Sequence, residues 1–68
     1  MTTEKLIAEY QSRVTECDKA IEGLTASIKK ARGEKEDESV IADIANERKV
    51  EDAKRQAYFQ FIKNLEDL

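Results

Sequence analysis

The 68-residue sequence contains no histidine, proline or tryptophan, and it has one cysteine and two glycines. A lone cysteine cannot form an intramolecular disulfide, and without histidine it cannot complete a tetrahedral zinc site. The commonest general base is therefore missing, as are glycine-rich phosphate loops and serine elbows. These absences predict that the protein is not an enzyme, with no catalytic residues, no metal and no cofactor.

Long hydrophobic runs are absent as well. No segment approaches the ~18 apolar residues of a membrane-spanning helix, and no run of signal-peptide length follows the N-terminus. The net charge of −3 gives little attraction for anionic membranes or nucleic acids. Together with a free thiol, these features predict a cytoplasmic protein without a membrane partner and argue against nucleic acid.

What the sequence does contain is a regular apolar stripe. Charged residues of both signs make up 40% of the chain, which is typical of long, solvent-exposed helices. Between them, apolar residues recur at alternating steps of three and four, which places them on one face of an α-helix. The stripe comprises Ile7, Tyr10, Val14, Cys17, Ile21, Leu24, Ile28 and Ala31. It predicts a surface that another helix covers.

The first helix is predicted over about residues 3–32. Thr2 or Thr3 can cap its free backbone N–H groups. Gly33 is expected just past its end, in a left-handed conformation. One continuous helix through the whole chain is the alternative, and Gly33 argues against it because glycine costs about 1 kcal/mol inside a helix.

The second helix is predicted over about residues 39–67, after a turn over about 33–38. Asp37 or Ser39 can cap it, in an acidic segment that suits the positive end of a helix. Two helices of equal length joined by a short turn predict an all-α fold. We expect residues 1–68 to form a single antiparallel, coiled-coil-like helical hairpin.

The second helix is apolar at both ends and polar in its middle. Its stripe contains Ile41, Ile44, Arg48, Glu51, Arg55, Tyr58, Ile62 and Leu65. In one interpretation the helix rotates so that Val50, Ala53 and Ala57 fill the middle of the core instead.

In a second interpretation, Arg48, Glu51 and Arg55 form a semi-buried polar layer, of the kind that sets register and oligomer state. In a third, the same three residues are a recognition surface.

Three of the four aromatic residues, Tyr58, Phe59 and Phe61, lie within four positions. They point in too many directions for one neighbouring helix to bury them all, and chains this short seldom bury a sufficient core alone. Ala20, Gly23 and Ser27 would allow another helix to approach closely, or are simply tolerated at the surface. We expect a homodimer that forms a four-helix bundle; a groove for a different protein is the alternative.

The predicted function is that of a small, non-enzymatic protein-interaction or regulatory protein that acts through helix–helix contacts. The alternatives are a structural self-assembly unit and a Rop-like nucleic-acid-binding helical bundle. The predicted partner or oligomer interface comprises Ile7, Tyr10, Val14, Ile21, Leu24, Ile28, Ile41, Ile44, Tyr58, Phe59, Phe61, Ile62 and Leu65.

The two ends of the sequence carry a resemblance to a class of proteins. The opening segment MTTEKLI and the closing segment FIKNLEDL resemble the small helical-hairpin accessory proteins that bacteriophages and mobile elements encode. The resemblance implies a modulator that binds a host or phage protein in the host cytoplasm. It assigns no role to individual residues.

Overall fold

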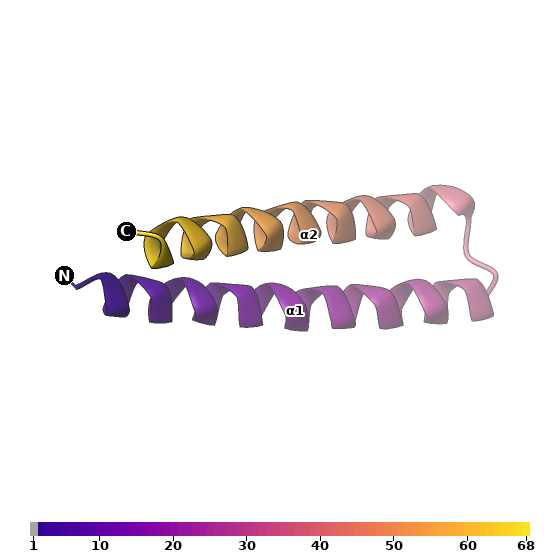
Figure 1. The fold of residues 1–68 in the computed structure, drawn as a ribbon. Helices are drawn as coiled ribbons and strands as arrows, with labels where there is room; N and C mark the ends of the chain where they lie inside the picture. The colour runs from indigo at the N-terminus through magenta and orange to yellow at the C-terminus, as the bar shows by residue number, and fades with distance from the viewer. Residues whose placement is uncertain (1) are drawn as a thin grey trace.

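The structure is a computed structural model and describes residues 2–68. Over these residues it has two α-helices, α1 (Thr3–Gly33) and α2 (Glu38–Glu66). They lie side by side in opposite directions, so that both termini lie at one end of the rod and the turn at the other (Figure 1). The rod measures 49 × 14 × 14 Å. The all-α helical hairpin predicted from the sequence is confirmed.

The start of α1 follows from its capping residue. Thr2 has an extended backbone, and its hydroxyl oxygen accepts a hydrogen bond from the backbone N–H of Lys5 at 3.2 Å. This bond satisfies one of the four N–H groups that the first turn of a helix leaves free. Glu4 in the first turn and Arg32 in the last turn carry the charges that the helix dipole favours at those ends.

The end of α1 differs from the prediction. Gly33 is still helical, and the left-handed residue is Lys35, with φ of 56°. The backbone N–H of Glu36 donates to the carbonyl of Ala31 at 3.0 Å, and that of Lys35 donates to the carbonyl of Arg32 at 3.2 Å. These two bonds form a Schellman motif, whose left-handed position falls on Lys35. Packing decides this outcome, because the buried Ala31 holds the last turn helical beyond the point that glycine marks.

We expect Lys35→Gly to raise the free energy of unfolding by about 1 kcal/mol, because a left-handed backbone costs a residue with a Cβ atom roughly that much. Thermal denaturation followed by circular dichroism measures the change. The matched control is Lys35→Ala, which removes the charge and the long side chain but keeps the Cβ atom. An equal gain in both variants would show that the backbone conformation is not the cause.

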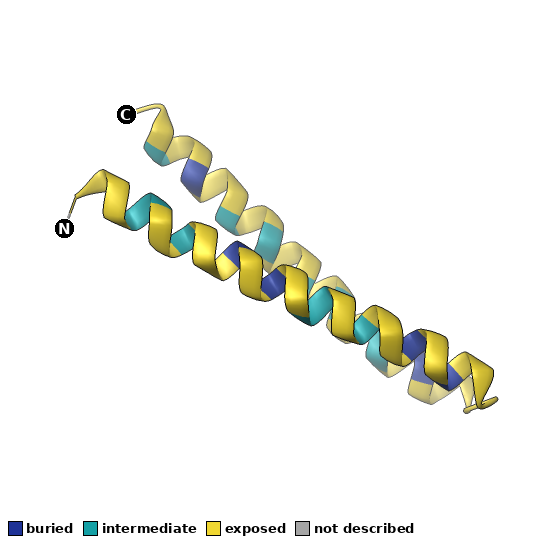
Figure 2. Ribbon diagram, turned by 90° about the horizontal axis from the view of Figure 1, so that it is seen from below, coloured by how far each residue is buried: buried dark blue, intermediate teal, exposed yellow. Residues whose placement is uncertain are grey.

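The core begins as a compact cluster beside the turn. Ile28, Ala31 and Ile41 are buried together, with Ile44 and Ala45 packed against them. Burial follows the facing sides of the two helices, as the dark and teal segments show in Figure 2. Ile28 therefore meets Ile41 and Ile44 in the antiparallel register that the two apolar stripes predict.

A second cluster lies toward the open end of the hairpin. The ring of Tyr10 packs on Tyr58 and Phe61, with centroid distances of 5.7 and 4.6 Å. Val14 and Ile62 are buried in the same half of the rod. The two helices are thus joined by apolar contacts near both ends.

The interpretation that Val50, Ala53 and Ala57 fill the middle of the core is wrong. All three are exposed, and Val50 retains 55% of its accessible surface. The reason is geometric. Ile41 and Ile62, both buried, lie three heptads apart and so face α1 from the same side of α2. Because both ends of α2 pack on α1 in this way, the residues at the heptad positions between them also face α1, whatever their polarity.

Candidate interaction surface

Exposed apolar side chains gather along one side of α2. Val40, Val50, Phe61 and Leu68 are 40%, 55%, 46% and 92% exposed. Val40 and Phe61 are three heptads apart, so they project from the same side of α2. Val50 lies next to their row, and Leu68 follows the end of the helix at Glu66. Together with Ala20 and Gly23 of α1, these four residues are called the apolar side here.

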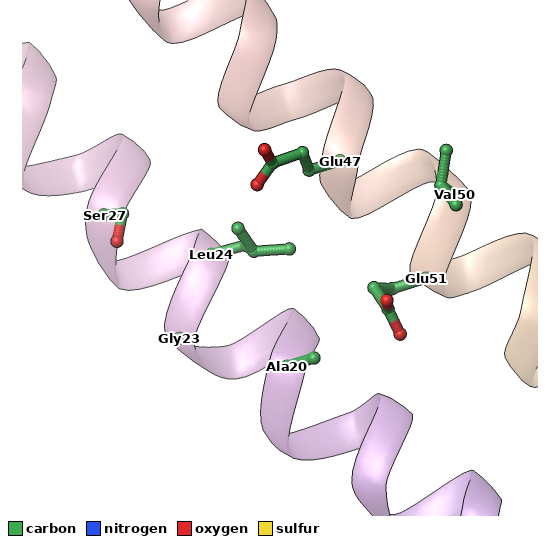
Figure 3. Close-up of a pocket in the computed structure, with 7 residues that line it drawn as sticks. All are labelled: Ala20, Gly23, Leu24, Ser27, Glu47, Val50 and Glu51. Carbon is green, nitrogen blue, oxygen red and sulfur yellow. The ribbon is translucent and has the colours of Figure 1, made fainter.

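A shallow groove of about 590 Å³ runs along the apolar side between the helices (Figure 3). Its lining residues are Ala20, Gly23, Leu24 and Ser27 of α1 and Glu47, Val50 and Glu51 of α2. Leu24 projects across it toward α2, and Val50 points away from α1. Apart from the neighbouring residues and the backbone of its own helix turn, a Cβ atom added at Gly23 would meet no atom within 4 Å. The backbone of α1 is therefore accessible here to another helix.

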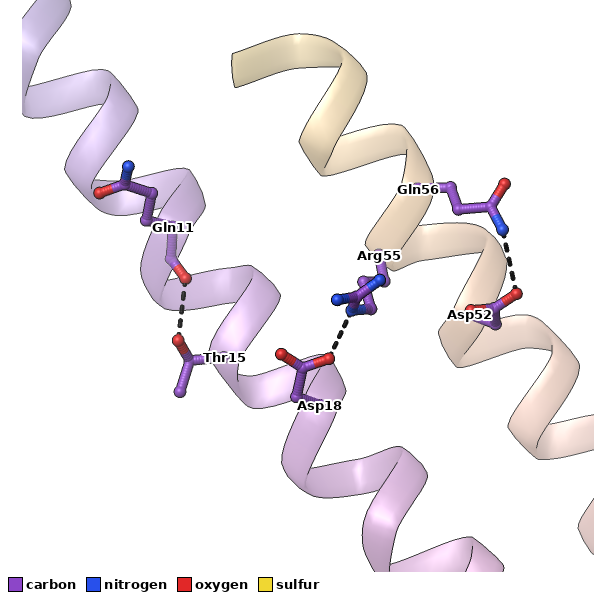
Figure 4. A network of polar contacts seen from close by, with 6 residues as sticks. All are labelled: Gln11, Thr15, Asp18, Asp52, Arg55 and Gln56. Carbon is purple, nitrogen blue, oxygen red and sulfur yellow. Dashed lines mark hydrogen bonds and ion pairs between the residues drawn. The ribbon is translucent and has the colours of Figure 1, made fainter. Parts of the chain in front are cut away.

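The polar middle of α2 faces α1, as the polar-layer interpretation expects. Arg55 forms an ion pair with Asp18 of α1 (Figure 4), and the guanidinium of Arg48 reaches the hydroxyl of Thr25 at 3.5 Å. Arg48, Glu51 and Arg55 are all half-buried, whereas Asp18 is 51% exposed. Such solvent-accessible pairs contribute at most about 1 kcal/mol. The layer therefore contributes little to the stability of the hairpin.

The surface around Asp18 is polar, and besides these two contacts between the helices it carries hydrogen bonds within single helices. The hydroxyl of Thr15 donates to the carbonyl of Gln11 at 3.1 Å, and the amide of Gln56 donates to the carboxylate of Asp52 at 3.1 Å (Figure 4). Asp18, Thr25, Asp52 and Gln56 are called the polar side here. Its charges are well solvated, so it offers little apolar surface for a helix to cover.

Phe59 is the exception on that polar side. The guanidinium of Arg55 lies 4.7 Å from the centre of the Phe59 ring, which remains 46% exposed. The three clustered aromatics thus divide as their spacing predicts. Tyr58 faces α1, Phe61 borders the apolar side, and Phe59 borders the polar side.

Cys17 lies at the seam beside Glu51, where both line a small hollow. Burial raises the pKa of the Cys17 thiol above its ordinary value of 9.0, and the carboxylate of Glu51 raises it further. The thiol is therefore protonated at neutral pH. A protonated, buried thiol is a packing residue rather than a nucleophile.

This burial has a measurable pH dependence. Well below pH 9.0 the thiol is protonated in both the folded and the unfolded chain, and its contribution to stability is constant. Above that pH the unfolded thiol ionises first, so we expect stability to fall more steeply with pH in the wild type than in Cys17→Ala. Denaturant titrations at pH 8, 9 and 10 compare the slopes.

We also expect alkylation of the folded protein to be at least about tenfold slower than in denaturant; equal rates would contradict burial.

The hairpin itself uses most of the predicted interface residues. Val14, Ile28, Ile41 and Ile62 are buried between α1 and α2, whereas Phe59 and Phe61 are exposed. The remaining seven residues are half-buried: Ile7, Tyr10, Ile21, Leu24, Ile44, Tyr58 and Leu65. Sequence reasoning did not single out Val40, Val50 and Leu68 as one surface with Phe61. The signal was the three-heptad spacing of Val40 and Phe61, on the side of the helix next to the stripe.

Comparison of the chain with protein-family models, with curated proteins and with solved structures finds no match. Neither helix within residues 2–68 has a stretch long and apolar enough to cross a membrane. In the same part of the chain, no three His, Cys, Asp or Glu side chains are grouped so that they could hold a metal ion. The functional proposal therefore rests on the surface of the hairpin.

Proposed function

We propose that this chain is a small, non-enzymatic protein that acts by helix–helix contact, and that its first partner is a second copy, with which it forms a four-helix bundle. The observation that supports this most is the apolar side. Four large apolar side chains are exposed on this side of a hairpin in which six described residues are buried. A second hairpin on this side would convert a two-helix layer into a bundle with an enclosed core.

The energetics of a two-helix layer favour such an association. Domains of this size bury too little surface for robust stability unless disulfides, metals or oligomerisation assist them. Fully burying a Val or Phe side chain contributes about 1.5–3 kcal/mol, and a symmetric dimer counts each residue twice. Covering Val50 and Phe61 would therefore add several kcal/mol to a hairpin whose own core is thin.

Light scattering coupled to size-exclusion chromatography tests the proposal. The expected mass is twice the 7.8 kDa of the chain, and Val50→Asp is expected to reduce it toward 7.8 kDa while most helical signal remains. The control is Lys49→Asp, at another exposed position of α2 but on the polar side. A wild-type mass of 7.8 kDa at high concentration would refute self-association.

Regulation of a different protein is the second candidate function, and it would fit a phage-encoded modulator. The exposed ring of Phe59 favours it, because this aromatic lies on the polar side and would stay accessible in the dimer. Affinity capture with the wild type and with Phe59→Ala distinguishes the cases. We expect one stoichiometric protein that the wild type retains and Phe59→Ala loses, although both have the same mass and helicity.

A further inference from the structure

We propose that the two copies meet through α2, which packs antiparallel against the partner's α2 with Val50 beside the two-fold axis. This inference rests on the proposed self-association and specifies its geometry. It places the two turns at opposite ends of the bundle. The occupant of the apolar side is thus a second copy of this chain in one defined register.

The register follows from a row of four residues with seven-residue spacing. Val40, Glu47, Lys54 and Phe61 project from the same side of α2. When this row is placed antiparallel to its own copy with the centre beside Val50, Val40 lies opposite the partner's Phe61. Glu47 then lies opposite the partner's Lys54. Two-fold symmetry repeats both contacts, so the row matches apolar with apolar and acid with base throughout.

Other alignments of the same row bring like charges together. A shift by one heptad in one direction places Glu47 opposite the partner's Glu47. The opposite shift places Lys54 opposite the partner's Lys54. A parallel alignment produces both clashes at once. Like charges that face each other are destabilising, so charge complementarity selects the register centred beside Val50.

The charged residues of the row are available for these contacts. Glu47 is exposed at the edge of the groove. Lys54 pairs with Glu51 at 3.4 Å, but its side chain is 52% exposed. An ammonium group has three donors, so Lys54 can bind Glu51 and the partner's Glu47 together.

The surface of α1 is compatible with the same axis. Ala20 and Gly23 line the groove together with Val50, so they lie close to the proposed centre. Their small side chains would let α1 approach its own copy where the four helices converge.

Charge exchange tests the register. Glu47→Lys and Lys54→Glu each create two like-charge contacts in a homodimer, so we expect each to weaken dimerisation by about tenfold. An equimolar mixture of the two variants restores both contacts in a heterodimer, and the double variant restores them in a homodimer. The control is Lys49→Glu on the polar side, which should leave the dimer unchanged. Analytical ultracentrifugation measures all five samples.

Energy transfer provides a readout that keeps the apolar side intact. Donor-labelled and acceptor-labelled samples of Lys35→Cys in a Cys17→Ala background are mixed, with a dye pair whose Förster distance is well below 49 Å. Turns at opposite ends of a rod 49 Å long would give weak transfer, whereas a bundle that packs α2 on the partner's α1 places both turns together and gives strong transfer. Strong transfer, or a dimer that the mixture of charge variants fails to restore, would overturn the register. A monomeric wild type would instead refute the underlying self-association.

Discussion

Ile28→Asp is expected to unfold the hairpin at room temperature. Ile28 is 5% exposed and lies at the centre of the cluster beside the turn, against Ala31 and Ile41. The substitution removes about 1.5–3 kcal/mol of apolar burial. It also places a carboxylate in an apolar cluster, which costs several kcal/mol more or forces the group to protonate. Small domains have about 5–15 kcal/mol of stability in total, so the combined loss approaches the whole of it.

Circular dichroism at 222 nm and thermal denaturation measure this loss. The matched control is Val50→Asp, the same type of change at a position that is 55% exposed. It should keep most of the helical signal, because its effect falls on association rather than on the hairpin. A milder variant, Ile28→Val, should lower stability by about 0.5–1.5 kcal/mol. A wild-type melting temperature for Ile28→Asp would mean that the cluster beside the turn does not hold the helices together.

The parts of the fold that the sequence predicts well are those that many residues specify together. The stripe of α1 repeats over eight positions, so no single residue decides where the helix lies or which face it buries. Thr2 adds a local start signal that agrees with this pattern. The pairing of Ile28 with Ile41 follows once the two stripes are joined by a short turn. Agreement between local and long-range preferences makes these features predictable.

The end of α1 was not predictable because one local signal opposed one tertiary contact. Glycine at position 33 is the usual left-handed residue at a helix end, and nothing local favours Lys35. The buried contact of Ala31 with Ile41 extends the helix to Gly33 and moves the reversal two residues further. Such a contact enters only when both helices are in place.

The rotation of α2 posed a different difficulty. Its sequence supports two stripes, one through Arg48 and Arg55 and one through Val50 and Ala57. In the middle of the helix, residue-by-residue hydrophobicity favours the stripe through Val50 and Ala57 as the side that faces α1. The apolar clusters at both ends of α2 instead turn the stripe through Arg48 and Arg55 toward α1. The exposed apolar side follows from that rotation. The sequence contains the spacing of Val40 and Phe61, but their exposure depends on which stripe faces α1.

Replacing the polar layer is expected to have the second large effect, and in the opposite direction. The triple variant Arg48→Leu, Glu51→Leu, Arg55→Leu places three apolar side chains at half-buried positions that face α1. Each gains about 1 kcal/mol of burial, so we expect the free energy of unfolding to rise by about 2–4 kcal/mol. The loss of the Asp18 ion pair offsets little of this, because Asp18 is 51% exposed and remains hydrated.

The control moves the same three substitutions one position along α2. Lys49→Leu, Asp52→Leu and Gln56→Leu have the same spacing but lie on exposed positions of the polar side. They should leave the midpoint of urea denaturation nearly unchanged. A destabilised polar-layer variant would show instead that Arg48, Glu51 and Arg55 hold the hairpin together through their charges.

The stabilised variant should also be less specific in its assembly. A uniform apolar seam allows α1 and α2 to slide by a heptad, whereas the contact of Arg55 with Asp18 exists in one alignment. We therefore expect light scattering to find several oligomeric species in the triple variant where the wild type has one. If the variant is more stable and still forms one species, the ends of the hairpin alone set the register. The polar layer would then serve contact with another protein. The capture experiment with Phe59→Ala tests for such a contact, because Phe59 packs against Arg55 of the layer.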